Sequence, residues 1–95
     1  MLINQPDIIY IERSNRKIIV STIKESLCFS AYSLEEVMEQ LSESHIRCHR
    51  SYIINKNFIK KIDSKNNLVY LYHLDRAISI GRRFKEQLLM TFYSK

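Results

Sequence analysis

Residues 45–62, HIRCHRSYIINKNFIKKI, constrain the fold of this chain more than any other stretch. They contain five Lys or Arg and two His, and they contain no Asp or Glu. Apolar Ile, Tyr and Phe side chains lie between the charges from Tyr52 to Ile62. A surface loop does not need so many apolar residues, and a buried strand cannot hold so many cations. We therefore expect an element with one face in a core and a cationic face in water, as a polyanion binder requires.

The charge of the whole chain is positive and unevenly placed. Its 95 residues carry 15 Lys or Arg against 10 Asp or Glu, which gives a formal net charge of +5. Residues 34–43 contain four Glu and no cation, whereas 45–62 and 82–85 together carry eight cations and no acid. This balance favours an anionic partner such as nucleic acid or a membrane surface, although a merely basic soluble domain stays open on charge alone.

The length of the chain points to one domain over residues 1–95. Cys28 and Cys48 form neither a disulfide framework nor a zinc pattern, so we expect both to pack as small apolar residues. A redox role for Cys48 is the alternative, and it would require thiolate formation. The N-terminus does not resemble a signal peptide, and no apolar run approaches the ~20 residues of a membrane span, so we expect a cytoplasmic protein.

Short β-rich runs separated by polar turns predict a mainly β fold. The expected strands are residues 8–11, 17–22, 25–30, 46–48, 58–62, 68–72 and 76–80. The first two runs and the last two are expected to pair as hairpins. Residues 51–57 are expected to be irregular.

Two amphipathic helices are expected as well. Apolar residues at i, i+3, i+4 and i+7 predict a helix over residues 33–41, with Ser33 and Glu36 as its capping box and its glutamates in water. A second helix is predicted over 82–93. Gly81, the only glycine, precedes it and is expected to adopt a backbone conformation that a Cβ would strain.

The sequence does not predict an enzyme, a metal site or a cofactor. One glycine cannot build a phosphate-binding loop. His45 and His49 are four residues apart on a β-like segment with no carboxylate nearby to complete a metal site. Cys48 and His49 are adjacent on a strand, so their side chains point to opposite faces. Ser51 has no evident base.

The order of these segments resembles the LytTR DNA-binding domain, which is usually the output module of bacterial response regulators. The resemblance covers residues 7–92 and runs through DIIYIE (7–12), SLEEVMEQL (33–41), RCHRSYIINKNFIKKI (47–62) and SIGRRFKEQL (79–88). Its most specific element is HRSYIIN (49–55), which matches the family pattern His-x-Ser-aromatic-x-x-Asn. The chain departs from the family at Gly81, where Ser is common, and in its brief N-terminal strand.

The resemblance implies antiparallel β-sheets with two short helices, and loops that enter the grooves of double-stranded DNA. It implies binding to direct repeats, with pairing of two copies on the DNA, and a receiver domain if the chain is part of a longer regulator. Carried over by position, the base contacts would be Asn15, Arg16, Arg50 and Arg82. The phosphate contacts would be Arg47, Ser51, Arg83 and Lys85, and the charge pattern adds Lys60 and Lys61.

Two other functions remain open at this point. One is a single-stranded nucleic-acid or RNA module that stacks bases on exposed Tyr. The other is a protein-interaction domain for an acidic partner. Individual residues also have structural alternatives: His49 is expected to pack under its loop and bind backbone, Asn55 to bind local backbone, and Lys60 and Lys61 to protect a strand edge.

Overall fold

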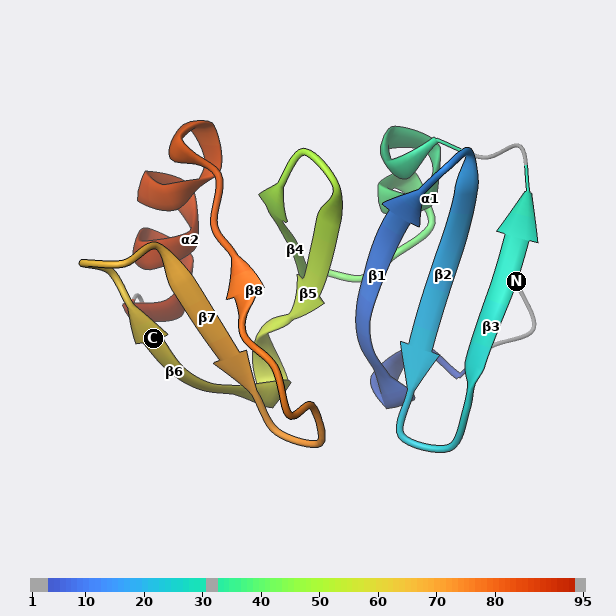
Figure 1. Ribbon diagram of the computed structural model, residues 1–95, viewed down its shortest axis with the longest axis horizontal. Helices are drawn as coiled ribbons and strands as arrows, with labels where there is room; N and C mark the ends of the chain where they lie inside the picture. The colour runs from blue at the N-terminus through green and yellow to red at the C-terminus, as the bar shows by residue number, and fades with distance from the viewer. Residues whose placement is uncertain (1–3, 31–32, 94–95) are drawn as a thin grey trace.

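The computed structural model describes residues 4–30 and 33–93. These residues form a five-stranded antiparallel sheet, a three-stranded antiparallel sheet and two α-helices (Figure 1). The predicted mainly β class is confirmed. The elements in chain order are η1 (Gln5–Asp7), β1 (Ile8–Ser14), β2 (Lys17–Thr22), β3 (Ser26–Ser30), α1 (Leu34–Glu39), β4 (His45–His49), β5 (Tyr52–Asn55), η2 (Lys56–Phe58), β6 (Ile59–Asp63), β7 (Leu68–Leu71), β8 (Ile78–Ser79) and α2 (Arg82–Tyr93).

The larger sheet has the strand order β3-β2-β1-β5-β4. Strands β1 and β2 form the predicted hairpin, with Ser14 paired to Lys17 across a two-residue turn. Strand β5 lies between β1 and β4, so the expectation that residues 51–57 are irregular was wrong for residues 52–55. The error has a physical cause: β5 is covered on both faces, which removes the polar–apolar alternation that identifies a half-buried strand.

The smaller sheet has the order β6-β7-β8. Its last strand is only two residues long, shorter than the expected strand over 76–80. Helix α2 packs against β4 of the larger sheet. It covers the predicted range 82–93 and buries Leu88 completely. None of the helices in the described ranges is long and apolar enough to cross a bilayer.

The central strands of the larger sheet separate two hydrophobic cores. We call the core that includes the smaller sheet and α2 the inter-sheet core, and the core beneath α1 the α1 core. The buried residues of the inter-sheet core are Ile9, Tyr10, Ile46, Cys48, Ile54, Ile59, Val69, Leu71, Ile78, Ile80 and Leu88. Those of the α1 core are Ile8, Ile11, Ile18, Val20, Leu34, Val37 and Ile53.

Helix α1 begins as the sequence predicts. The Ser33 hydroxyl accepts a hydrogen bond from the Glu36 backbone N–H at 3.2 Å, which satisfies one of the free donors of the first turn. Leu34 and Val37 face the α1 core, and Glu35 and Glu36 are exposed, as expected.

Candidate nucleic-acid interface

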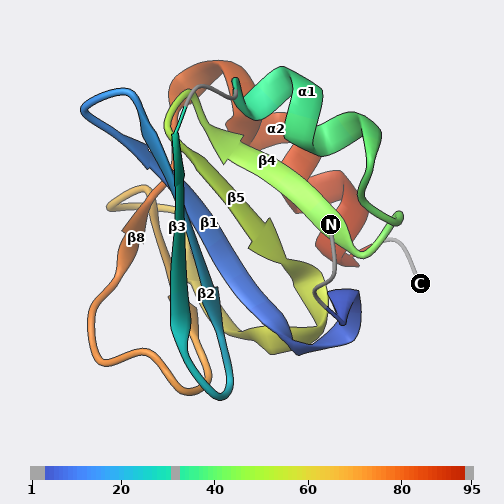
Figure 2. The ribbon, with the colours of Figure 1, turned by 90° about the vertical axis from the view of Figure 1, so that its right-hand side faces the viewer.

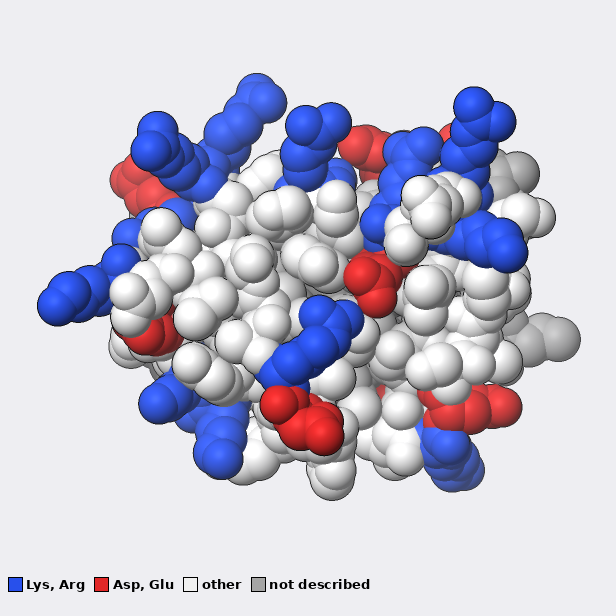
Figure 3. Space-filling model, in the orientation of Figure 1, with Lys and Arg blue, Asp and Glu red and all other residues white. Residues whose placement is uncertain are grey.

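Three connections between elements lie along one edge of the molecule. They are the β1–β2 turn, the β4–β5 turn and the junction between β8 and α2, all at the top of Figure 1. The orthogonal view in Figure 2 again puts them at the upper edge. Lys and Arg side chains project along that edge in Figure 3. We call these three segments the loop edge.

The β4–β5 turn consists of Arg50 and Ser51, and the His49 side chain stabilises it by a hydrogen bond. The His49 Nδ1 atom accepts a hydrogen bond from the Ser51 backbone N–H at 3.0 Å, and its ring lies 5.1 Å from that of Tyr52. Burial lowers the pKa of His49, and the charges of Arg50 and Arg47 lower it further. The structural role expected for His49 is thus confirmed, and Arg50 is left exposed at the tip.

The junction before α2 is held against β4 through the single glycine. The Gly81 N–H donates to the Cys48 carbonyl at 2.8 Å. Its φ is not positive, so the expected strained conformation was wrong. The glycine eases a close approach instead, because a Cβ there would make a tight contact of 3.3 Å with Phe84 Cδ2 and would lie 3.5 Å from His49 Cα.

Arg50 and Arg82 meet at a single hollow because of this close approach. The hollow has a volume of about 480 Å³ and is lined by His49, Arg50, Gly81, Arg82, Arg83 and Phe84. All three arginines are exposed. Two of the predicted base-contacting residues and one predicted phosphate-contacting residue therefore lie together, although their elements are far apart in the sequence.

The β1–β2 turn carries Asn15 and Arg16, both exposed and both with positive φ, 49° and 67°. A pair of left-handed residues is the conformation that closes a two-residue hairpin. The Arg13 N–H donates to the Ser51 carbonyl at 2.9 Å, which joins this hairpin to the β4–β5 turn. This contact of Arg13 was not predicted, because a contact between strands leaves no local signal in the sequence.

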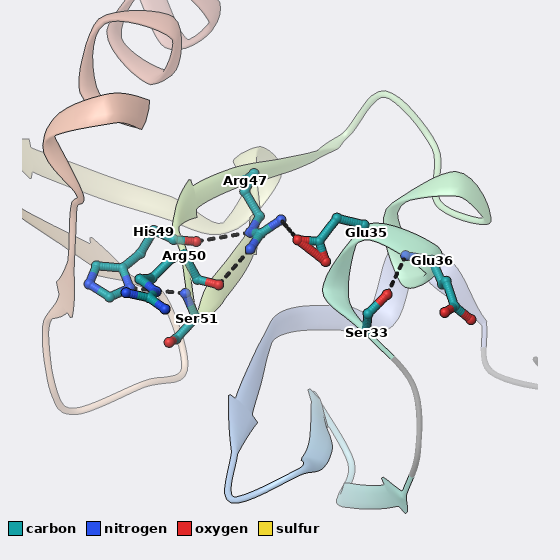
Figure 4. A network of polar contacts seen from close by, with 7 residues as sticks. All are labelled: Ser33, Glu35, Glu36, Arg47, His49, Arg50 and Ser51. Atoms are coloured by element: carbon teal, nitrogen blue, oxygen red, sulfur yellow. Dashed lines mark hydrogen bonds and ion pairs between the residues drawn. The ribbon is translucent and has the colours of Figure 1, made fainter.

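The Arg47 guanidinium lies between the β4–β5 turn and Glu35 of α1 (Figure 4). Its Nε donates to the His49 carbonyl at 2.9 Å, and its Nη2 donates to the Arg50 carbonyl at 2.5 Å. Its Nη1 lies 3.5 Å from Glu35 Oε1, and the Arg47 side chain is only 18% exposed. The pKa of the Glu35 carboxyl is lowered by a hydrogen bond from its own backbone and by the charge of Arg47. Glu35 is exposed, as the sequence predicts, but its partner Arg47 was not predicted.

The remaining predicted phosphate contacts lie elsewhere. Lys60 and Lys61 are exposed on β6, which runs along the lower left of Figure 1, away from the loop edge. The Lys61 ammonium lies 4.8 Å from the centre of the Tyr70 ring. Lys85 is in the first turn of α2, where its Nζ donates to the Ser64 carbonyl at 2.6 Å and ties the helix to the β6–β7 turn.

The two cysteines differ. Cys48 is fully buried in the inter-sheet core, and burial raises the pKa of its thiol to about 12. Cys28 is exposed on the edge strand β3, so the expectation that it packs as a small apolar residue was wrong.

Asn55 binds backbone, as expected: its Nδ2 donates to the Ile8 carbonyl and its Oδ1 accepts from the Asn57 N–H, both at 2.9 Å.

The chain is similar to proteins of a known family. The family model of the LytTr DNA-binding domain matches residues 1–92. In a solved structure, the LytTr DNA-binding domain of a Bacillus cereus protein described as a methyl-accepting/DNA response regulator superposes with a TM-score of 0.81. That match has 25% identity and covers 98% of this chain and 86% of the other.

Two curated relatives carry the name accessory gene regulator protein A. The relative from Staphylococcus epidermidis is 29% identical over 80 residues, and one from Staphylococcus aureus is 26% identical over 80 residues. Each match covers 84% of this chain but 34% of the relative, so the chain spans about a third of the length of these proteins.

Proposed function

Because the chain belongs to the LytTr DNA-binding domain family, we propose that it binds double-stranded DNA sequence-specifically and regulates transcription. The observation that carries this proposal is the meeting of Arg50 and Arg82 at one exposed hollow on the loop edge. The names of its relatives, a gene regulator and a response regulator, support the role of output domain in a two-component system.

Arg50 and Arg82 are the proposed base readers. A guanidinium fork matches the O6 and N7 acceptors of guanine in the major groove. Asn15 and Arg16 approach from another part of the same edge. The longest dimension of the protein is 33 Å, so the whole loop edge spans no more than about one helical turn of B-DNA, ~34 Å.

Phosphate contacts supply most of the affinity and its dependence on salt. We assign phosphate contacts to Ser51 in the β4–β5 turn and to Arg83 at the hollow. Lys85, whose ammonium binds the Ser64 carbonyl, would add a further contact. Lys60 and Lys61 contribute less, because β6 lies away from the loop edge. One domain offers one set of loops, so we propose that two copies pair on direct repeats.

The exposed aromatic side chains favour duplex DNA over a single strand. Tyr72 is 52% exposed and Tyr93 is 69% exposed. Tyr93 ends α2, whereas Arg82 begins it, and eleven residues of helix separate the two by about 17 Å. Tyr93 therefore lies too far from Arg82 to form a stacking surface beside the arginines, as single-strand binding requires.

A titration with selected and scrambled duplexes tests the proposal. A duplex enriched from a random pool at moderate salt serves as the cognate site. Arg50→Ala and Arg82→Ala are each expected to weaken cognate binding by about 1–3 kcal/mol, or roughly 5- to 150-fold, with little change on scrambled DNA. Lys60→Ala, which removes the same charge from β6, is the control and is expected to change both affinities little.

Three outcomes would contradict the proposal. In the first, Arg50→Ala and Arg82→Ala weaken cognate and scrambled duplexes equally. In the second, single-stranded DNA of the same sequence competes as well as the duplex. In the third, binding is insensitive to salt, whereas neutralisation of about six phosphates predicts a slope near −5 for log K against log salt. The third result would favour an acidic protein partner.

A further inference from the structure

We propose that Arg47 is a positioning residue that holds Arg50 and Arg82 in their DNA-reading arrangement, in place of the phosphate contact that the family resemblance implies. This inference rests on the proposed function and concerns the same interface. It removes Arg47 from the residues that we propose contact the DNA. The donors of the Arg47 guanidinium are bound within the protein, to the β4–β5 turn and to Glu35.

The Arg47 guanidinium closes the β4–β5 turn from behind. Its Nε and Nη2 donate to two successive carbonyls, those of His49 and Arg50, at 2.9 and 2.5 Å (Figure 4). A guanidinium presents its donors in a rigid planar fork, so two neighbouring bonds fix the carbonyls relative to each other. Because the Arg50 carbonyl is one of them, the backbone from which the Arg50 side chain projects is fixed as well.

The same guanidinium also contacts the helix that carries Arg82. Its Cζ lies 5.5 Å from the centre of the Phe84 ring, within the range of a cation–π contact. The Phe84 N–H in turn donates to the Gly81 carbonyl at 3.0 Å. Arg47 therefore links the tip of the β4–β5 turn to the first turn of α2, and the hollow between Arg50 and Arg82 lies on this link.

Glu35 supplies the counter-charge from α1. Its carboxylate is 70% exposed and 3.5 Å from Arg47 Nη1, so water and salt screen the pair. If Arg47 were a phosphate ligand, Glu35 would compete with the DNA for it, and removing the carboxylate would strengthen binding. If Arg47 acts on the turn carbonyls, removing that carboxylate leaves the two decisive bonds intact. Glu35→Gln thus separates the two roles without touching Arg47.

The first test uses Arg47→Lys, which keeps the charge but loses the fork. Wild-type protein and variant are titrated with the selected cognate duplex and with the scrambled duplex at several salt concentrations. The positioning role predicts at least a fivefold loss on cognate DNA, no loss on scrambled DNA and an unchanged salt slope. Undiminished cognate binding, or equal losses on both duplexes, would overturn the proposal.

The matched control is Arg83→Ala, an exposed arginine at the same hollow. It is expected to weaken both duplexes equally and to reduce the magnitude of the salt slope by about 0.9, as the loss of one phosphate contact requires. Arg47→Ala showing that same pattern would overturn the proposal. Circular dichroism and thermal melting verify that each variant is folded.

The second test is Glu35→Gln, which remains informative even if the Arg47 variants do not fold. The positioning role predicts affinities within about twofold of wild type on both duplexes. Tighter binding to both duplexes would overturn it. The proposed function fails separately, when wild-type protein itself does not discriminate between the duplexes. The positioning role fails when wild-type protein discriminates and Arg47→Lys discriminates equally well.

Discussion

Arg16, which we propose contacts DNA, lies at a turn position where a side chain costs stability. It is a non-glycine residue at φ 67°, in a turn where glycine would be unstrained. We expect Arg16→Gly to raise the free energy of unfolding by up to about 1 kcal/mol, because the left-handed conformation no longer crowds a Cβ. DNA affinity is expected to fall at the same time. Urea denaturation and duplex titration measure the two effects.

Lys17→Gly is the matched control for this change. It removes the same charge from the next residue, which lies in the extended strand β2. Glycine is unfavourable within a strand, so this variant is expected to lose about 0.5–1 kcal/mol of stability. If Arg16→Gly were destabilised as much as Lys17→Gly, the backbone at the turn would carry no strain.

Two histidines make stability depend on pH. Burial lowers the pKa of His45 and of His49, so the folded protein favours the neutral rings. Stability from this source is complete above the unfolded pKa of about 6.5 and falls as the pH drops below it. The loss is up to about 1.4 kcal/mol per pH unit for His45, and less for the partly exposed His49.

Urea denaturation between pH 8 and pH 5 measures this dependence. His45→Gln is expected to flatten the profile. A free energy of unfolding that stays constant from pH 7 to pH 5 would contradict the assignment.

At the scale of elements, local signals identified both helices and the β1–β2 and β7–β8 hairpins, because caps, periodicity and turns are written in neighbouring residues. Strand β5 was missed because its neighbours in space, β1 and β4, cover its edges, and two cores cover its faces. The same limit applies to the site. The family motifs predicted that Arg50 and Arg82 belong to it. The partners of Arg47 could not be predicted, because they depend on how α1 and the β4–β5 turn pack together.

The N-terminus of α1 offers a test at this scale. Ser33→Ala removes the hydroxyl that accepts from the Glu36 N–H, and it is expected to lower the free energy of unfolding by about 1 kcal/mol. Ser33→Asp restores an acceptor and should recover most of the loss. Chemical denaturation of the three proteins at pH 7 measures both changes. An Ala variant as stable as wild type would show that the cap adds nothing.

At the scale of the whole molecule, Arg76 connects the two sheets. It lies between β7 and β8, and its Nη2 donates to the Tyr10 hydroxyl on β1 at 2.7 Å. The same atom is 3.4 Å from Glu12 Oε1, and the guanidinium lies over the Tyr10 ring at 5.5 Å. The Arg76 side chain is 49% exposed, so solvent screening reduces the ion-pair part of this contact.

We expect Arg76→Ala to lower the free energy of unfolding by about 1 kcal/mol, mainly through the lost hydrogen bond to Tyr10. Tyr10→Phe removes the other partner of this bond while keeping the ring. In a double-mutant cycle, the two changes together should be less than additive. Additive effects measured by denaturation would show that the contact does not stabilise the joint between the sheets.

The place of β5 determines which part of the molecule opens last. Its Ile54 belongs to the inter-sheet core and its Ile53 to the α1 core, so the strand cannot detach without disrupting both. Amide protons of these residues should exchange with deuterated solvent only through global unfolding, while those of the edge strand β3 exchange through local fraying. The β4–β5 turn, which carries Arg50, is continuous with β5, so its backbone stays folded when other parts of the domain open. We therefore expect the turn to have its binding conformation before it contacts DNA.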